Sequence, residues 1–220
     1  EQINLRNYGI DFGLRNNQIS GSVEFYTRNS TDLISYSPLT PSTGFDEFRG
    51  NVADMNGKGL DLTLNSNIIQ TDRFVWQTNL LISYTSDKIT NYQAATTALG
   101  LHEGKPFSAL YSYRWAGLDP ETGDPLGYLD GEVSNAWSTL VGNDTEENVK
   151  YNGTSVPQWF GGIRNTLQYR NFTLSFNMLY KGGYYFRRPT INYNGLFTLV
   201  YPGNSDFSNR WQQPRDEMKT

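Results

Sequence analysis

The feature that most constrains this chain is a strict alternation of large apolar and small or polar side chains, which recurs in six stretches. In residues 8–14 the even positions carry Tyr, Ile, Phe and Leu, and the odd positions carry Gly or Asp. Residues 172–180 repeat the pattern with Phe, Leu, Phe, Met and Tyr at even positions. A period of two residues predicts β-strands with one apolar and one polar face.

The six stretches form three pairs, and a few polar residues separate the members of each pair. This spacing predicts three β-hairpins, at about residues 3–28, 59–86 and 158–186. Longer connections, rich in Pro and Gly turn pairs, cover about 29–56, 87–157 and 187–220. The chain therefore alternates short and long connections.

The length of the hairpin arms separates two kinds of β-protein. Soluble strands average about 5–6 residues, whereas strands that cross a membrane need about 9–11 because they tilt. Residues 19–28, 74–84 and 172–181 each sustain the pattern over about this longer length. Transmembrane barrels also have short turns on one side and long loops on the other. The pattern favours an antiparallel transmembrane β-barrel, although a soluble sandwich alternates in the same way.

Composition excludes several other classes of protein. The chain has 220 residues, with 18 basic against 22 acidic side chains, so no concentrated positive surface for nucleic acid is expected. It has no cysteine, which excludes disulfides and thiolate metal sites. No apolar run is long enough for a transmembrane helix. Because six strands are fewer than the eight that the smallest barrels have, we expect a segment of a larger barrel.

Several motifs resemble the SusC/RagA family of TonB-dependent outer-membrane transporters. The most distinctive are EGKP at 103–106, YSYRWAGLDP at 111–120, TGDP at 122–125 and VPQWFGG at 156–162. Further similar stretches are residues 9–14, 19–26, 31–34, 51–52, 56–61 and 74–79. Together these stretches follow the family's order along nearly the whole chain.

The resemblance implies that residues 1–220 are a late portion of a 22-stranded barrel in the bacterial outer membrane. Such proteins import oligosaccharides or peptides with energy passed on by TonB, and a SusD-like lipoprotein covers the extracellular face. Neither the plug domain nor the TonB box of the family is recognised in this chain. The sequence does not choose between oligosaccharides and peptides, and the resemblance implies no cofactor.

Aromatic residues in the longest connection are the candidate binding residues. They are Tyr111, Tyr113, Trp115, Tyr128 and Trp137. Aromatic rings stack on sugars and hold apolar peptide side chains with little loss of rotamer entropy. The alternative is that they pack the loop together or against the lid lipoprotein, and this is the more common role of such residues. Trp76, Tyr84, Trp159 and Tyr180 lie near strand ends, where a membrane barrel carries an aromatic girdle.

No catalytic or metal site is expected. Acidic residues at 119, 121, 124 and 130 have oxygen-ligand spacing but lack the order of an EF-hand loop, so a solvated turn is the preferred interpretation. His102 is the only histidine, and no partners for a triad or metal site accompany it. Charges on the polar face, at Asp11, Glu24, Asp61, Arg164 and Lys181, are expected to face water or a plug.

Two functional hypotheses follow from different classes. In the first, the chain is a segment of a β-barrel nutrient importer that contacts outer-membrane lipid. In the second, it is a secreted soluble β-sandwich that binds glycans through exposed aromatic side chains. A passive porin-like barrel is a weaker variant of the first. The two main hypotheses differ in whether the apolar face meets lipid or a second sheet.

Overall fold

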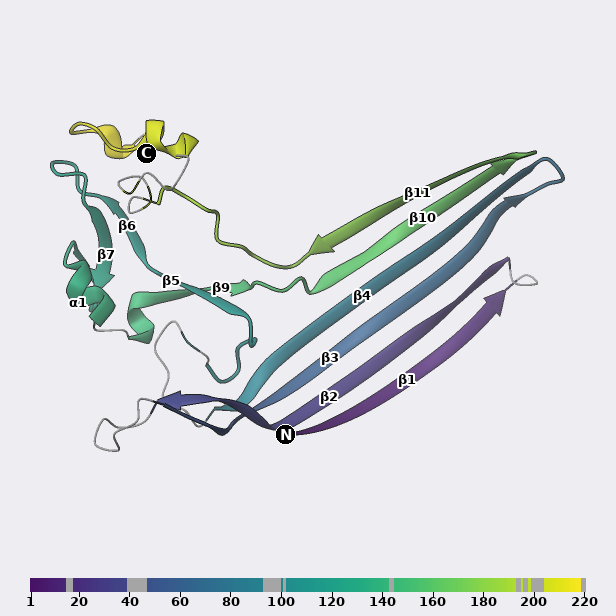
Figure 1. The fold of residues 1–220 in the computed structure, drawn as a ribbon, viewed down its shortest axis with the longest axis horizontal. Helices are drawn as coiled ribbons and strands as arrows, with labels where there is room; N and C mark the ends of the chain where they lie inside the picture. The colour runs from purple at the N-terminus through teal and green to yellow at the C-terminus, as the bar shows by residue number, and fades with distance from the viewer. Residues whose placement is uncertain are drawn as a thin grey trace. The chain divides into compact units, whose positions relative to one another are not determined.

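The computed structural model describes residues 1–14, 18–38, 47–92, 100, 102–142, 145–192, 195, 198 and 204–218. The chain divides into two compact units, which are described separately (Figure 1). The strand unit comprises Glu1–Thr96, Gly100–Ala109 and Gly153–Tyr185, and the loop unit comprises Thr97–Leu99, Leu110–Asn152 and Phe186–Thr220. Among the described residues, no helix has the length and apolar character needed to cross a membrane.

The strand unit is built on one sheet of six long strands. They are β1 (Gln2–Leu14), β2 (Ile19–Pro38), β3 (Glu47–Gln70), β4 (Phe74–Tyr92), β10 (Trp159–Tyr169) and β11 (Phe172–Gly182). The strands lie side by side in this order, and every neighbouring pair is antiparallel. The prediction of an all-β antiparallel sheet of long strands is confirmed.

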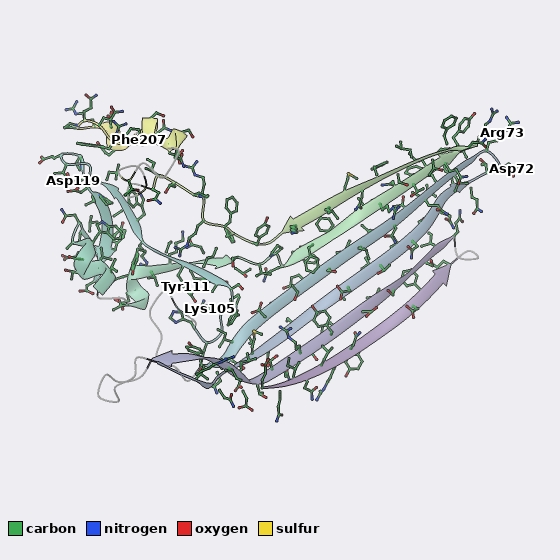
Figure 2. All side chains as sticks on the ribbon, viewed as in Figure 1. Asp72, Arg73, Lys105, Tyr111, Asp119 and Phe207 are labelled. Atoms are coloured by element: carbon green, nitrogen blue, oxygen red, sulfur yellow. The ribbon has the colours of Figure 1, made fainter. Side chains whose placement is uncertain are left out.

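The three expected hairpins fall on β1–β2, β3–β4 and β10–β11. Asp72 and Arg73 lie in the short link between β3 and β4, at one end of the sheet (Figure 2). The region 29–56, expected as a loop, is instead mostly strand, because β2 continues to Pro38 and β3 begins at Glu47. The link between them, residues 39–46, lies outside the described residues.

Irregular register explains why sequence alternation did not reveal these strand extensions. The β2–β3 register shifts on both sides of Leu33, and the β3–β4 register shifts between Asp54 and Met55. Asp32 has a φ of 58° and donates its backbone N–H to the Asp54 carboxylate at 3.0 Å. Each bulge moves the following side chains to the other face, which breaks the period of two.

A small core forms where these extensions meet the segment at 102–108. Backbone hydrogen bonds join Ile89 N–H to Lys105 O at 2.9 Å and Gly104 N–H to Ile89 O at 2.8 Å. Val52, Ala53 and Ile89 are buried there, and Ile89 is only 1% exposed. The long strands are therefore fixed by packed side chains at the end that carries the long connections.

The register pairs the apolar residues of each strand with apolar residues of its neighbours. They therefore lie together on one face of the sheet. Tyr8, Phe25, Leu60, Tyr84 and Trp159 lie opposite one another in a single row across five strands. Further rows on this face contain Ile10, Phe12, Leu14, Ile19, Val23, Leu62, Leu64, Leu80, Ile82, Ile163, Leu167, Leu174, Phe176 and Met178. Most of these side chains lack cover; Ile10 is 72% exposed.

Aromatic rows bound this apolar face at both ends. At the end with the short links, Phe74, Tyr169 and Phe172 form one row. At the other end lies the row with Tyr84 and Trp159, whose ring centroids are 4.6 Å apart. From position 74 to position 84 the strand rises about 33 Å, and a tilt of about 40° reduces this to about 25 Å. That distance equals the height of the apolar band of membrane barrels.

One register shift and a few polar residues interrupt the apolar face, since Ser66, Thr78 and Asn165 lie in one of its rows. In β3 the register shifts between Asn67 and Ile69, so Ile69 and not Ile68 lies opposite Trp76. Asn165 is polar but buried; its Oδ1 accepts hydrogen bonds from Trp76 Nε1 at 3.0 Å and Thr78 Oγ1 at 2.7 Å. These bonds satisfy the amide oxygen without water.

The opposite face is mainly polar. Cross-strand hydrogen bonds join Asn7 to Glu24 at 3.0 Å, Gln77 to Asn67 at 3.0 Å and Thr166 to Ser175 at 3.1 Å. Apolar side chains interrupt it at Ile3, Leu5, Tyr26 and Val75, and at a group of three, Leu81, Phe160 and Leu179. Gly162 lies between Leu81 and Leu179 in one row, and the three side chains border a groove of about 490 Å³.

The many glycines and aromatic residues of the chain are coupled in space. A Cβ atom at Gly59 would collide with the ring of Tyr26, whose hydroxyl group contacts Thr85 Oγ1 at 3.2 Å. A Cβ atom at Gly21 would lie 3.0 Å from the ring of Phe12 and would collide with a backbone oxygen. Glycine in a strand thus lets a ring from the neighbouring strand lie across the sheet.

We expect Met178→Arg to destabilise the full-length protein by about 2–4 kcal/mol, because this position lies near the middle of the apolar band. Asn177→Arg is the matched control on the polar face of the same strand, and its cost should be close to zero. Refolding into lipid vesicles under denaturant measures both. Equal costs at the two positions would contradict the assignment of the faces.

We expect Gly161→Ala to cost about 1–3 kcal/mol, because the added Cβ would meet the backbone oxygen of Leu81 on the paired strand. In Gly57→Ala the nearest atom to the new methyl group would be 3.7 Å away, in the Arg28 side chain. The same denaturation measurement compares the two. If both variants lose the same stability, the close approach at position 161 has no energetic consequence.

Candidate functional site

The described residues of the loop unit form short strands, one short α-helix and 3₁₀ helices at Glu146–Asn148, Ser205–Asn209 and Asp216–Met218. The strands and the α-helix are β5 (Ala109–Tyr113), β6 (Trp115–Leu118), β7 (Pro125–Leu129), β8 (Glu132–Ser134), α1 (Trp137–Gly142) and β9 (Val149–Thr154). β6, β7 and β8 form one sheet, and β5 pairs with β9. Helix α1 packs on β7, where a Cβ atom at Gly127 would contact Leu140 and Trp137. Leu140 is completely buried and forms the centre of this unit.

Most of the five candidate aromatic residues pack within this unit. Tyr111 on β5 is 5% exposed, and its ring centroid lies 5.6 Å from that of Tyr151. Tyr113 and Trp137 make an edge-to-face contact at 6.0 Å, and Trp137 Nε1 donates to Pro125 O. These contacts order the loop, which was the alternative role considered from the sequence.

The remaining two aromatic residues differ in exposure. Tyr128 on β7 is half-buried, whereas Trp115 on β6 is 60% exposed. The five residues are therefore not gathered into one surface, and Trp115 alone among them offers a largely free ring. Contact between these residues and a substrate stays a prediction.

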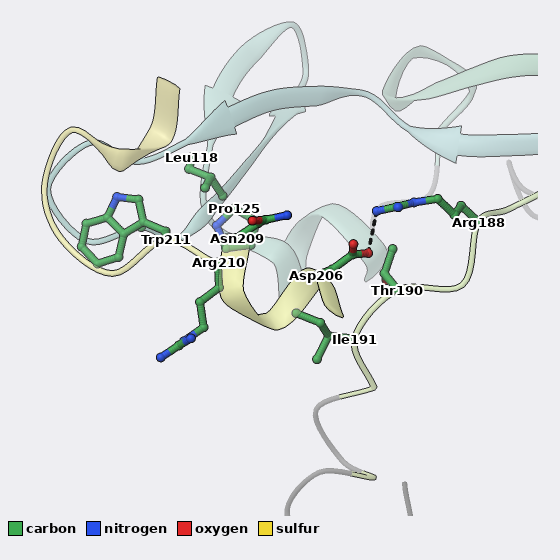
Figure 3. A pocket seen from close by; sticks show the side chains of 10 residues that line it. Leu118, Pro125, Arg188, Thr190, Ile191, Asp206, Asn209, Arg210 and Trp211 are labelled. Atoms are coloured by element: carbon green, nitrogen blue, oxygen red, sulfur yellow. Dashed lines mark hydrogen bonds and ion pairs between the residues drawn. The ribbon is translucent and has the colours of Figure 1, made fainter. Parts of the chain in front are cut away.

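A pocket of about 560 Å³ lies elsewhere in the loop unit (Figure 3). Leu118, Pro125, Ile191 and the indole of Trp211 supply its apolar walls. None of the five candidate aromatic residues lines it. The pocket is therefore formed by two segments that are about 70–90 positions apart in the sequence, and no sequence motif predicts that they meet.

Polar groups at the pocket come from the segment around Arg188 and from the last described segment, 204–218. Arg188 Nη2 and Asp206 Oδ2 form an ion pair at 2.5 Å, shown as a dashed line in Figure 3. Asn204 holds this segment in place, because its Oδ1 accepts the backbone N–H of Asp206 at 2.9 Å. The Arg210 guanidinium lies 3.9 Å from the centroid of the Phe207 ring. The arrangement offers an aromatic wall beside paired charges.

Trp211 is the residue that sequence reasoning missed. Its ring lies against Gly123, and a Cβ atom at that position would collide with the ring. Gly123 has a φ of 74°, so the turn that it closes also requires glycine. A tryptophan among polar residues near position 211 could have marked a buried contact. Nothing in the sequence indicated that Gly123 is the residue it contacts.

The acidic stretch near Asp119 is a turn held by its own backbone. Asp119 Oδ1 accepts the N–H groups of Thr122 at 2.9 Å and Glu121 at 2.8 Å. These bonds, that of Thr122 first, hold the pKa of Asp119 below its usual value. Asp130 belongs to a different turn, between β7 and β8. Within the described residues, no group of three metal-ligating side chains is present.

Comparison with known proteins gives consistent relatives, although no family model matches the chain. It is 26% identical to TonB-dependent receptor P39 of Formosa agariphila over 122 residues, which are 54% of this chain and 12% of that protein. It is 23% identical to TonB-dependent receptor SusC of Bacteroides thetaiotaomicron over 197 residues, covering 81% of this chain and 19% of SusC. The chain thus spans about a fifth or less of these relatives.

The fold is similar to that of a solved transporter. The structure of the RagAB peptide transporter matches 99% of this chain and 25% of that chain, with a TM-score of 0.75 and 21% sequence identity. Because the similarity covers nearly all of the present residues, the segment has the fold of part of that protein's β-barrel. The resemblance to the SusC/RagA class of TonB-dependent transporters is thereby confirmed, and this chain has the fold of a segment of their barrel.

Proposed function

We propose that the full-length protein containing this chain is an active importer of oligosaccharides or peptides in the bacterial outer membrane. The strand unit forms part of the barrel wall, and the loop unit forms part of the outer vestibule. The observation that carries the proposal is the continuous apolar face bounded by two aromatic rows about 25 Å apart. The apolar band of membrane barrels has the same height.

The length of the strands argues against the soluble sandwich. Strands of soluble proteins average about 5–6 residues, whereas β1, β4 and β10 have 13, 19 and 11 residues. A sheet whose long apolar face met water would aggregate, whereas acyl chains solvate such a face. The glycan-binding sandwich is therefore not supported by a specific observation.

Energy and partners are part of the proposal. The similar proteins are named TonB-dependent receptors, and RagAB is named a peptide transporter. We infer that TonB acts on a part of the polypeptide outside these residues, and that a SusD-like lipoprotein covers the vestibule. The protein then works by transport and not by catalysis. The exposed side chains at Leu81, Phe160 and Leu179 offer a plug domain an apolar contact within the barrel.

We expect the full-length protein to sediment with the outer-membrane fraction, and its electrophoretic mobility to change when it is boiled in detergent. A closed barrel resists detergent until heat separates its strands, since every strand edge is paired. A protein that is soluble without detergent would contradict the proposal and favour the sandwich.

We expect Trp115→Ala to weaken uptake of the protein's substrate by about two- to ten-fold, the value of one aromatic contact. Fluorescently labelled mixtures of oligosaccharides and of oligopeptides, supplied to cells separately, identify the substrate class and measure uptake. Val133→Ala is the matched control, because Val133 is 57% exposed in the same unit but has no ring. Equal uptake by the two variants would show that the Trp115 ring does not contact the substrate.

A further inference from the structure

The apolar face ends abruptly at the aromatic row that contains Tyr84. The next row on the same face is Arg6, Thr27, Lys58 and Ser86, and the one after it is Asn4, Asn29, Asn56 and Lys88. Every side chain in these two rows is polar or cationic. With about 6.6 Å of strand per row and a tilt of about 40°, they lie about 5 and 10 Å beyond the aromatic row.

This height corresponds to the headgroup layer of a bilayer. The polar region on each side of the hydrocarbon is about 5–7 Å thick, so the backbone of the first row lies within it and that of the second about 3–5 Å beyond it. Because the two rows continue the apolar face, their side chains point toward lipid and not toward the barrel interior. Long cationic side chains extend several ångströms toward the interface, which brings the charges of Arg6, Lys58 and Lys88 within reach of lipid phosphates.

A pocket of about 380 Å³ opens within these rows, across β2, β3 and β4. Lys58 and Lys88 supply two ammonium groups, and Asn29 and Asn56 supply amide donors. No ion pair of the described residues involves either lysine. A phosphate, with its several acceptor oxygens, matches this set of donors and charges.

One carboxylate borders the pocket but does not neutralise it. Asp87 pairs with Gly57, which lies between Asn56 and Lys58 in β3. Because successive residues of a strand point to opposite faces, Asp87 lies on the face opposite to the two lysines. Its Oδ2 accepts the backbone N–H of Phe107 at 2.9 Å. The lipid-facing side of the pocket therefore keeps two positive charges without a counter-charge of its own.

We propose that this pocket binds the phosphate of an anionic lipid headgroup. The inference rests on the membrane placement proposed above. The site ties the barrel wall to a charged lipid next to the region where β2, β3 and β4 continue out of the membrane. It supplies lysines as compact charges and amides as directional donors, a combination suited to a phosphodiester or phosphomonoester.

The test uses the full-length protein in nanodiscs of phosphatidylcholine with and without phosphatidylglycerol, and native mass spectrometry counts the bound lipids. We expect retention of phosphatidylglycerol, with affinity lowered about five-fold by Lys58→Gln or Lys88→Gln and about twenty-five-fold by the double variant. Lys181→Gln removes the same charge from the polar face and should leave retention unchanged. Lys58→Arg with Lys88→Arg should preserve it.

Three results would overturn the inference. One is equal retention of the two lipids by the wild-type protein, and another is unchanged retention by the double variant. The third is loss of retention when inorganic phosphate is added at millimolar concentration, which would indicate a site for free phosphate. The heat-dependent mobility of every variant separates this test from that of the proposed function: a protein that fails to enter membranes contradicts both, whereas an inserted barrel without lipid preference contradicts the pocket alone.

Discussion

The structure depends on one constraint: the backbone N–H and C=O groups of each strand must be hydrogen-bonded to neighbouring strands. At the same time, the two faces of the sheet are suited to two different environments, lipid on one side and water on the other. In hydrocarbon an unpaired backbone group costs several kcal/mol, on the order of one hydrogen bond lost without replacement by water. Strands longer than those of soluble proteins, paired along their whole length, meet that requirement. With the membrane placement proposed above, the alternation of side chains follows, because only every second residue then touches lipid.

Composition and geometry are linked through the same sheet. The rings of Tyr26 and Phe12 lie over Gly59 and Gly21, so an abundance of glycine accompanies an abundance of aromatic residues. Tyr84 and Trp159 make a tilted ring contact at one edge of the apolar band, and Phe74, Tyr169 and Phe172 line the other. Glycine therefore makes room for aromatic rings on the sheet, and the aromatic rows mark the two edges of the apolar band. In a membrane barrel such rows lie at the two interfaces and fix the depth of the sheet.

The sequence predicted the elements whose side chains keep a regular period. The arms of β1, β10 and β11 were recognised because no bulge interrupts them. A shift between Asn67 and Ile69 in β3 places Ile69 on the apolar face, and no feature of the sequence marked this shift. The outer halves of β2 and β3 were missed for the same reason, since each bulge exchanges the faces.

The candidate site was less predictable than the fold. The aromatic residues of the long connection were visible, but sequence does not distinguish a packed ring such as Tyr111 from an exposed one such as Trp115. The contact of Trp211 with Gly123 joins positions 88 residues apart and has no local signal. Pockets formed by distant segments, including the cationic pocket beside Lys58, emerge only when register and turns are known.

The most direct test of the two-solvent account is a spin-label scan of β11 in the full-length protein. Single cysteines are introduced at positions 172–181 and labelled in lipid bilayers; these 220 residues contain no native cysteine, and any cysteine in the remainder of the full-length protein is first replaced by serine. The account predicts that the even positions are accessible to oxygen dissolved in lipid and the odd positions to a water-soluble nickel complex or to neither. Even positions shielded from oxygen would place the apolar face in a dry protein core and contradict the account.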